Sequence, residues 1–327
     1  MRKILRAAPL LLPLIVSCAA EERDGFFAMD TVVELCAVGG ESALDAARRA
    51  VEDVEGWADC YDPEAELYRL NLSAGGGPVR VSKGLAEVLE VSLRVAEKSG
   101  GAFDPTVLPL VEAYGFNGEK RRVPGDEEIS RILPRVDYRR VGLAGDGVDI
   151  PEGVALDLGG VAKGYAADRA LEAMKEAGAE AGLVNIGGDI AVFGERAGGG
   201  SWTIGVQHPR APGELFAVLE LQSGAVATSG DYERYFIEDG VRYHHILDPR
   251  TGRPARGLVS VTVTAPVCVL ADAYATAVFV LGPEEGLRLL EADDDLEGLL
   301  IFAKTDGGLD FTVTDGLEGR LELLSGK

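Results

Sequence analysis

The sequence predicts an α+β fold built on mixed, mostly antiparallel sheets with packed helices, and three observations lead to that prediction. Of the 327 residues, 46% are hydrophobic and 26% are charged, which is the composition of a globular protein with a large core. Short runs of β-branched and apolar residues are joined by turn residues, as they are in antiparallel hairpins. Helical patterns are mixed in without the regular strand–helix alternation of a Rossmann-type parallel sheet.

In the first half, helices outnumber strands. The β-branched run Thr31–Val38 predicts a strand, and Ser42–Trp57 carries apolar residues at helical spacing. Ser82 is a suitable N-cap for a second helix, which we expect Gly100 to end. A short third helix is predicted over Asp126–Leu133.

The second half is richer in strands. Two segments on either side of Glu238-Asp239-Gly240 predict a hairpin, and Asp306-Gly307-Gly308 predicts the turn of another one near the end. The predicted strands are Trp202–Gln207, Phe216–Leu221, Tyr232–Ile237, Val241–Ile246 and Val259–Ala265.

The N-terminus has the pattern of a bacterial lipoprotein signal. Basic residues precede the apolar run Ala7–Val16, which is too short to span a bilayer, and small residues then lead to Cys18. We predict a signal peptide over residues 1–17, a lipidated linker over 18–25 with the lipid on Cys18, and one domain over 26–327. The mature protein would be exported and held on a bacterial membrane surface without spanning it. An ordinary secretory signal with an incidental cysteine is the alternative.

The formal net charge of −22 argues against nucleic acid as a partner, because phosphate binding needs a basic surface. Besides Cys18, whose thiol would carry the lipid, the mature chain would have three cysteines: Cys36, Cys60 and Cys268. They form neither a disulfide framework nor a paired zinc signature, although one disulfide is compatible with their number.

The stretch Leu156–Leu171, LDLGGVAKGYAADRAL, places glycines and a lysine where a strand is expected to turn into a helix. Gly159, Gly160 and Gly164 would let a phosphate approach the helix start, where free N–H groups favour negative charge, and Lys163 adds a cation. Glycines needed only for tight packing would give the same pattern.

Asp272 and Thr276 in ADAYATA are four residues apart and therefore share one face of a helix. A carboxylate and a hydroxyl are hard oxygen ligands that suit Mg²⁺. The alternative is an N-capping aspartate followed by a threonine bonded to its own helix.

The adjacent His244 and His245 would face opposite ways on a strand, so at most one of them points into a given site. Histidine suits general-base catalysis near neutral pH. The small polar run Thr228-Ser229-Gly230 before this hairpin would shape a pocket loop or only a turn, and no G-x-S-x-G elbow supports a serine hydrolase.

Taken together, six segments resemble the ApbE family, the bacterial FAD:protein FMN transferases. They occur in the family's order and cover nearly the whole mature chain. The segments are GGAFDPTV (Gly100–Val107), LDLGGVAKGYAAD (Leu156–Asp168), NIGGDI (Asn185–Ile190), TSGDYERYF (Thr228–Phe236), HHILDPRTGRP (His244–Pro254) and ADAYATA (Ala271–Ala277).

The resemblance implies a FAD site between two sub-domains and a role for particular residues. His245 matches the family's proposed base, and the metal ligands would be Asp272, Thr276 and the backbone carbonyl of Gly160. Contacts to FAD would come from Met29, Tyr61, Ala102, Phe103, Asp104, Asp157, Lys163 and Ile246. The sequence departs from the family at Met29-Asp30-Thr31, where the family has Met-Gly-Thr, and before Asn71, where hydroxyl residues are missing.

The implied activity is Mg²⁺-dependent transfer of FMN from FAD to a threonine or serine of an acceptor protein, with release of AMP. The acceptor would be another exported or membrane-bound protein, such as a redox subunit. The departures near Met29 and Asn71 leave two alternatives. One is a Mg²⁺-dependent FAD pyrophosphatase, which would use the same site, and the other is a non-catalytic FAD-binding lipoprotein.

Overall fold

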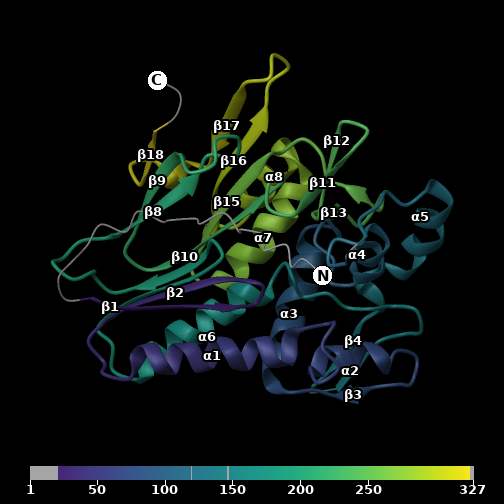
Figure 1. The fold of residues 1–327 in the computed structure, drawn as a ribbon, viewed down its shortest axis with the longest axis horizontal. Helices are drawn as coiled ribbons and strands as arrows, with labels where there is room; N and C mark the ends of the chain where they lie inside the picture. The colour runs from purple at the N-terminus through teal and green to yellow at the C-terminus, as the bar shows by residue number, and fades with distance from the viewer. Residues whose placement is uncertain (1–20, 119, 146, 325–327) are drawn as a thin grey trace, which may run out of the picture.

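The computed structural model describes residues 21–118, 120–145 and 147–324, and its central feature is an eight-stranded sheet (Figure 1). The strand order is β1-β2-β6-β7-β10-β15-β16-β17, and all neighbours in it pair antiparallel. This arrangement confirms the predicted α+β class. The strands are β1 (Glu22–Ala28), β2 (Thr31–Val38), β6 (Ala181–Ile186), β7 (Asp189–Phe193), β10 (Gly224–Gly230), β15 (Ser260–Ala265), β16 (Glu297–Ala303) and β17 (Leu309–Val313).

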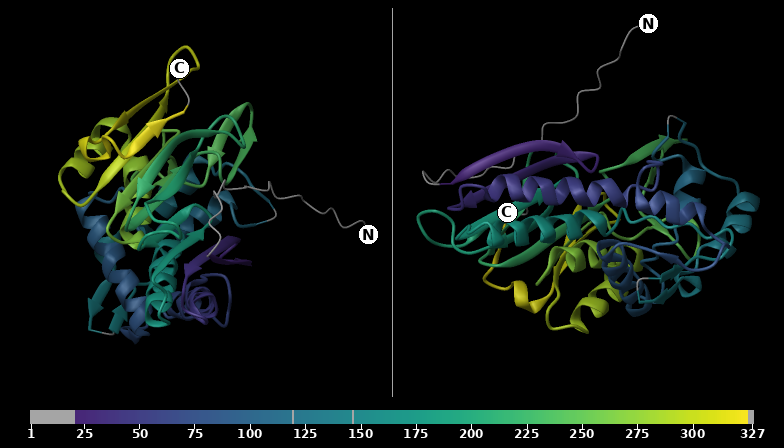
Figure 2. Two further views of the ribbon diagram at one scale, coloured as in Figure 1. Left: turned by 90° about the vertical axis from the view of Figure 1, so that its left-hand side faces the viewer. Right: turned by 90° about the horizontal axis from the view of Figure 1, so that it is seen from below.

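Helices cover one face of this sheet. Alternate residues along the strands, such as Val33 and Leu35 on β2 and Val261 and Val263 on β15, enter one core cluster with the helices. Two of these helices, α1 and α6, lie side by side beneath the sheet (Figure 2). The helices of this layer are α1 (Ala43–Ala58), α3 (Lys83–Lys98), α6 (Ala162–Glu176), α7 (Cys268–Leu281) and α8 (Pro283–Glu291).

The opposite face carries a second, smaller core. The intervening strand residues, including Leu183, Val192 and Ile301, pack there against a three-stranded sheet of order β18-β9-β8. Its strands are β8 (Trp202–Gln207), β9 (Leu215–Leu221) and β18 (Leu321–Leu323), and the 3₁₀ helix η3 (Asp315–Leu317) lies in the same layer.

The remaining elements gather at one end of the molecule, on the right in Figure 1. Side chains of α2 and of the small sheet enter the large cluster with the main sheet. Residues of α4 pack instead with Phe116, Val136 and Leu247 in a third, separate cluster. The elements are α2 (Glu66–Leu72), α4 (Leu108–Tyr114), α5 (Asp126–Ile132), the 3₁₀ helices η1 (Leu133–Arg135) and η2 (Tyr138–Arg140), the sheet of β3 (Val79–Arg80), β5 (Gly147–Asp149) and β4 (Gly142–Ala144), and the hairpins β11 (Tyr235–Glu238)–β12 (Val241–His244) and β13 (Leu247–Asp248)–β14 (Arg253–Pro254).

Most predicted elements are confirmed within a few residues. The Oγ of Ser82 accepts a hydrogen bond from the N–H of Leu85 at 3.3 Å, which makes it the N-cap of α3. Asp239 and Gly240 both have positive φ values, 50° and 76°, as a two-residue hairpin turn requires. The three thiols of Cys36, Cys60 and Cys268 are free.

Two sequence expectations differ from the structure. The segment expected to form a strand before α6 joins no sheet, because its hydrogen bonds go elsewhere: the side chain of Asn71 bonds both the N–H and the C=O of Leu156, at 2.7 and 2.9 Å. The N–H of Asp157 donates to the carbonyl of Pro105 at 2.8 Å. In addition, β1 begins at Glu22, inside the segment assigned to a linker, because its residues pair in register with β2.

The predicted signal peptide and Cys18 lie outside the described residues. Within the described part of the chain, none of the helices has the length and apolar character needed to cross a bilayer.

Candidate active site

Helices α6 and α7 cross at the centre of the candidate site, and each caps the other. Helix α7 starts after Val267, whose apolar side chain cannot cap it, and Asp168 of α6 instead accepts the N–H groups of Cys268 and Val269 at 2.7 and 2.8 Å. In return, Asp272 of α7 accepts the N–H of Gly164, in the first turn of α6, at 3.1 Å. Asp272 therefore does not cap its own helix, as the alternative interpretation of the sequence proposed.

The three predicted metal ligands lie together at this crossing. Asp272 and Thr276 follow each other on one face of α7, and a Cβ on Gly160 would lie 3.3 Å from the Oγ1 of Thr276. Ser229 at the end of β10 adds a further hydroxyl, 3.3 Å from the same Oγ1 atom. These donors are all oxygen atoms, so the set fits a hard divalent cation such as Mg²⁺.

Lys163 does not offer a free cation to an anion, because its ammonium forms an ion pair with Asp189. Asp189 follows the Gly187-Gly188 turn and is buried at the start of β7. Burial disfavours the charge on Lys163, but the carboxylates of Asp189 and Asp272 outweigh it and raise its pKa. Burial and the neighbouring Asp189 in turn raise the pKa of Asp272 to about 7. One lysine between two carboxylates leaves an excess of negative charge that suits a cation.

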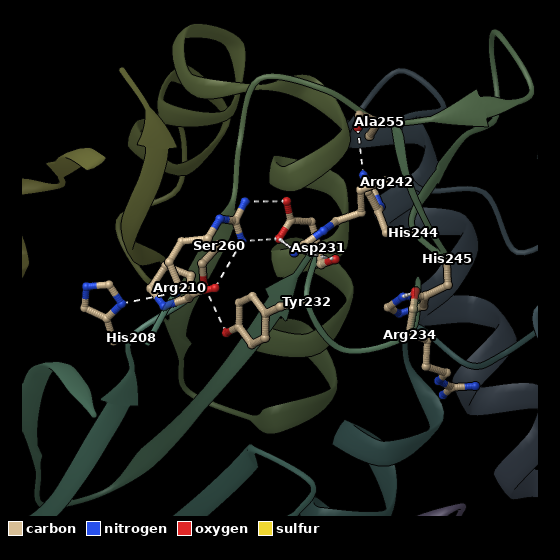
Figure 3. A network of polar contacts seen from close by, with 11 residues as sticks. His208, Arg210, Asp231, Tyr232, Arg234, Arg242, His244, His245, Ala255 and Ser260 are labelled. Atoms are coloured by element: carbon tan, nitrogen blue, oxygen red, sulfur yellow. Dashed lines mark hydrogen bonds and ion pairs between the residues drawn. The ribbon is translucent and has the colours of Figure 1, made fainter. Parts of the chain in front are cut away.

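The two histidines point in different directions, as predicted (Figure 3). His244 is buried, lies edge-on to Phe279 and donates from Nε2 to the carbonyl of Ala255 at 2.9 Å. His245 is half-buried, and its Nδ1 lies 3.2 Å from the carbonyl oxygen of Arg234. Because a carbonyl only accepts hydrogen bonds, Nδ1 of His245 carries the proton and Nε2 keeps its lone pair.

Electrostatics keep His245 neutral. Burial lowers its pKa to about 3, and the positive charges of Arg234 and Lys163 act in the same direction. A general base must start the reaction with a free lone pair, as Nε2 of His245 has, although a pKa this far below neutrality makes the imidazole a weak base.

A chain of polar contacts forms the other side of the site. Arg234 donates to the Oδ1 of Asn117 at 3.2 Å, and the amide of Asn117 donates to the hydroxyl of Tyr61 at 3.0 Å. Burial raises the pKa of Asp157, and the nearby charge of Arg234 opposes that effect. Within the described ranges of the chain, Arg234 forms no ion pair, so its charge is available to an anion.

The comparison with known proteins decides the family. The model of the ApbE family matches residues 29–300, which is most of the chain. The chain belongs to the ApbE family. The resemblance found in the sequence is thereby confirmed.

Curated relatives of this ApbE chain are named FAD:protein FMN transferase. The chain is 39% identical over 257 residues to a FAD:protein FMN transferase of Treponema pallidum, covering 73% of this chain and 71% of that protein. It is 36% identical to a protein of the same name from Vibrio cholerae, covering 80% and 79%. The crystal structure of the ApbE protein of Thermotoga maritima superimposes with a TM-score of 0.85 at 34% identity, covering 92% and 99% of the two chains.

Several predicted flavin contacts lie near the α6–α7 crossing in this ApbE chain. Ala102 and Phe103 are buried, and the Phe103 ring would be 3.3 Å from a Cβ on Gly160. Asp104 is buried too, but its carboxylate already accepts the N–H and hydroxyl of Thr106 and the N–H of Tyr138.

Other predicted contacts lie on the hairpin turns and loops. Met29 has a φ of 52° in the β1–β2 turn, and its N–H donates to the carboxylate of Glu55 at 2.6 Å. Asp30, where the family has glycine, adopts a φ of 59°, a conformation that aspartate tolerates better than most residues. Tyr61 is 43% exposed, whereas Ile246 is buried directly after His245.

Sequence reasoning assigned no role to Asp168, Asp189 or Arg234, which the structure places at this site. Asp189 carried a signal, because an acid directly after a Gly-Gly turn in an apolar strand needs a partner. Asp168 and Arg234 carried none, since their partners are 100 and 117 positions away in the chain.

Proposed function

We propose that this chain transfers FMN from FAD to a serine or threonine hydroxyl of an acceptor protein, with release of AMP. The observation that carries the proposal is the combination of a neutral histidine, His245, with an oxygen-rich cation site at Asp272 and Thr276. Lys163 links the two, because its charge acts on both His245 and Asp272. The names of the relatives support the same activity.

In the proposed reaction, the acceptor hydroxyl attacks the flavin-side phosphorus and the bond to the bridging oxygen breaks. Nε2 of His245 takes the hydroxyl proton, and AMP leaves with the bridging oxygen. Arg234 would donate hydrogen bonds to the diphosphate, and Asp157 would accept hydrogen bonds from FAD.

Asp272, Thr276 and the carbonyl of Gly160 would hold Mg²⁺, which fits their oxygen chemistry. When bound, the ion supplies charge neutralisation at the phosphate oxygens. The Lys163 ammonium is paired with Asp189, and its charge also acts on Asp272.

We also propose that the chain is exported and anchored by lipid on Cys18, on the strength of its N-terminal pattern. The acceptor would then be another exported or membrane protein. Mass spectrometry of the mature protein from its native host would find a diacylated N-terminal cysteine, and a Cys18→Ser variant would leave the membrane fraction. An uncleaved N-terminus would contradict this proposal.

The activity is tested with purified protein, FAD, Mg²⁺ and candidate acceptor domains, followed by mass spectrometry for a phosphodiester-linked FMN. We expect labelling that EDTA or Asp272→Asn abolishes and that the exposed Asp294→Asn control retains. Rapid release of FMN and AMP from FAD without an acceptor would instead favour the pyrophosphatase. Tight FAD binding without turnover under any divalent metal would favour the binding protein.

A further inference from the structure

A buried carboxylate outside the reaction centre holds two arginines from distant parts of the chain (Figure 3). Asp231, the first residue after β10, is only 9% exposed. Arg210 binds both of its oxygens, with Nη1 and Nη2 each 2.7 Å away, and Arg242 donates to Oδ1 at 3.1 Å. Two arginines on one carboxylate form strong, directional hydrogen bonds.

These contacts join three separate segments. Arg210 lies in the connection between β8 and β9, Asp231 leaves the main sheet, and Arg242 is on β12. The β11–β12 hairpin pairs with no other strand in the described ranges of the chain. Its orientation on the molecule therefore depends on side-chain contacts, including this one.

A short path leads from Arg242 to the proposed base. The Arg242 guanidinium stacks over the ring of Tyr235 at 4.2 Å, which ties β12 to the start of β11. The preceding residue, Arg234, accepts on its carbonyl oxygen both the backbone N–H of His245 at 3.0 Å and the ring nitrogen at 3.2 Å. The segment that Asp231 begins therefore sets both the position and the tautomer of His245.

We propose that Asp231 is a positioning residue for the transfer reaction, acting with Arg210 and Arg242 as a clamp that orients the hairpin and, through it, His245. This inference rests on the proposed function, because it assigns His245 as the base. Asp231 itself touches no reacting atom. Loss of the clamp allows the hairpin to move, and a displacement near 1 Å at a reacting group costs up to about 100-fold in rate.

The test compares Asp231→Asn, Arg242→Ala and the double variant with wild type in FAD-dependent labelling of an acceptor domain. Each single variant should lower kcat about 10- to 100-fold, with KM for FAD within about two-fold. The double variant should lose less than the product of the two single losses, because the two residues share the Asp231–Arg242 contact. Arg242→Lys, which keeps the charge, should recover part of the lost kcat.

The matched control is Arg48→Ala. Arg48 donates from Nε and Nη2 to Asp24, with a side chain about as exposed as that of Arg242, but the pair joins α1 to β1, away from the hairpin (Figure 1). Its kcat should equal that of wild type. Unchanged kcat in Asp231→Asn, or a rise in KM for FAD alone, would overturn the clamp.

Hydrogen exchange on the free protein separates failure of the clamp from failure of the proposed function. Amides of β11 and β12 should exchange at least about 10-fold faster in Asp231→Asn, and at the wild-type rate in Arg48→Ala. Wild-type protein that transfers no flavin would refute the proposed function, while this exchange result would still decide whether Asp231 holds the hairpin. Unchanged exchange in Asp231→Asn would refute the clamp whatever the activity.

Discussion

Replacing Gly164 by alanine tests how closely α6 and α7 must approach for the site to form. A Cβ at Gly164 would lie 2.7 Å from the carbonyl carbon of Cys268 and 2.9 Å from the Cβ of Asp272, and it would also meet the Cys268 carbonyl oxygen. These are backbone atoms and a Cβ, so no side-chain rotation relieves the contact. The two helices must move apart.

The geometry sets the size of the effect. Ordinary contact begins at 3.4 Å and the Cys268 carbonyl oxygen is the closest atom, so the helices must separate by about 1 Å, a strain that typically costs about 1–3 kcal/mol. Alanine in a helix recovers about 1 kcal/mol of this relative to glycine. We therefore expect a net loss of up to about 2 kcal/mol and a fall in Tm of up to a few degrees. The same movement carries Asp272 away from Gly160 and should slow transfer about 10- to 100-fold.

Thermal unfolding and the rate of acceptor labelling, each measured over a Mg²⁺ titration, provide the assay. Gly56→Ala is the matched control, because Gly56 is exposed on α1 and a Cβ there would meet nothing within 4 Å. That control should gain about 1 kcal/mol of stability and keep its full activity. A Gly164→Ala protein that is as stable and as active as wild type would refute the close helix crossing and the site built on it.

Three further substitutions test individual residues. His245→Gln should keep FAD affinity within about two-fold in a fluorescence titration but slow labelling by about 10²–10⁴-fold, and lost FAD binding would reassign the residue to structure. Burial lowers the pKa of His244 to about 4, below its unfolded value of about 6.5, so its contribution of about 3 kcal/mol is complete above pH 6.5 and is lost as the pH falls toward 4. In urea unfolding, His244→Asn should flatten that acid-side decline, and an unchanged slope would argue against a buried neutral imidazole. Asp168→Ala removes the cap of α7 and should cost about 1–2 kcal/mol, whereas equal stability would show that water replaces the carboxylate.

Local patterns in the sequence predicted β2 and β15 of the main sheet and the turn between β16 and β17, but they did not predict β1, β6, β7 or β10. Thr31–Val38 and Trp202–Gln207 match β2 and β8 residue for residue, because alternation and β-branched residues report on a strand directly. One expected strand is absent from the described part of the structure. Leu156–Leu158 has strand-like composition, but the side chain of Asn71 satisfies its backbone and takes the place of a partner strand. Asn71 and Leu156 are 85 positions apart, so no local pattern in the sequence indicates that they are hydrogen-bonded.

In the candidate site, too, local spacing could be predicted from the sequence and contacts between distant segments could not. Residues four apart on one helix, Asp272 and Thr276, could be placed on one face from spacing alone. The approach of Gly160 to Thr276 could not, because it depends on how α6 crosses α7. The ion pair of Lys163 could not be predicted for the same reason, because its partner, Asp189, comes from a strand whose position the sequence does not relate to Lys163.

The pairing of Lys163 changes how an acidic protein can bind a diphosphate. A free lysine at a helix start would attract the substrate, but here the ammonium is held by Asp189 and also faces Asp272. In the proposed reaction, positive charge for the phosphates would therefore come from Arg234 and from a cation bound at Asp272. In this arrangement the charge of Lys163 offsets two buried carboxylates, Asp189 and Asp272. Lys163 would therefore support the proposed cation site and not take the place of the cation.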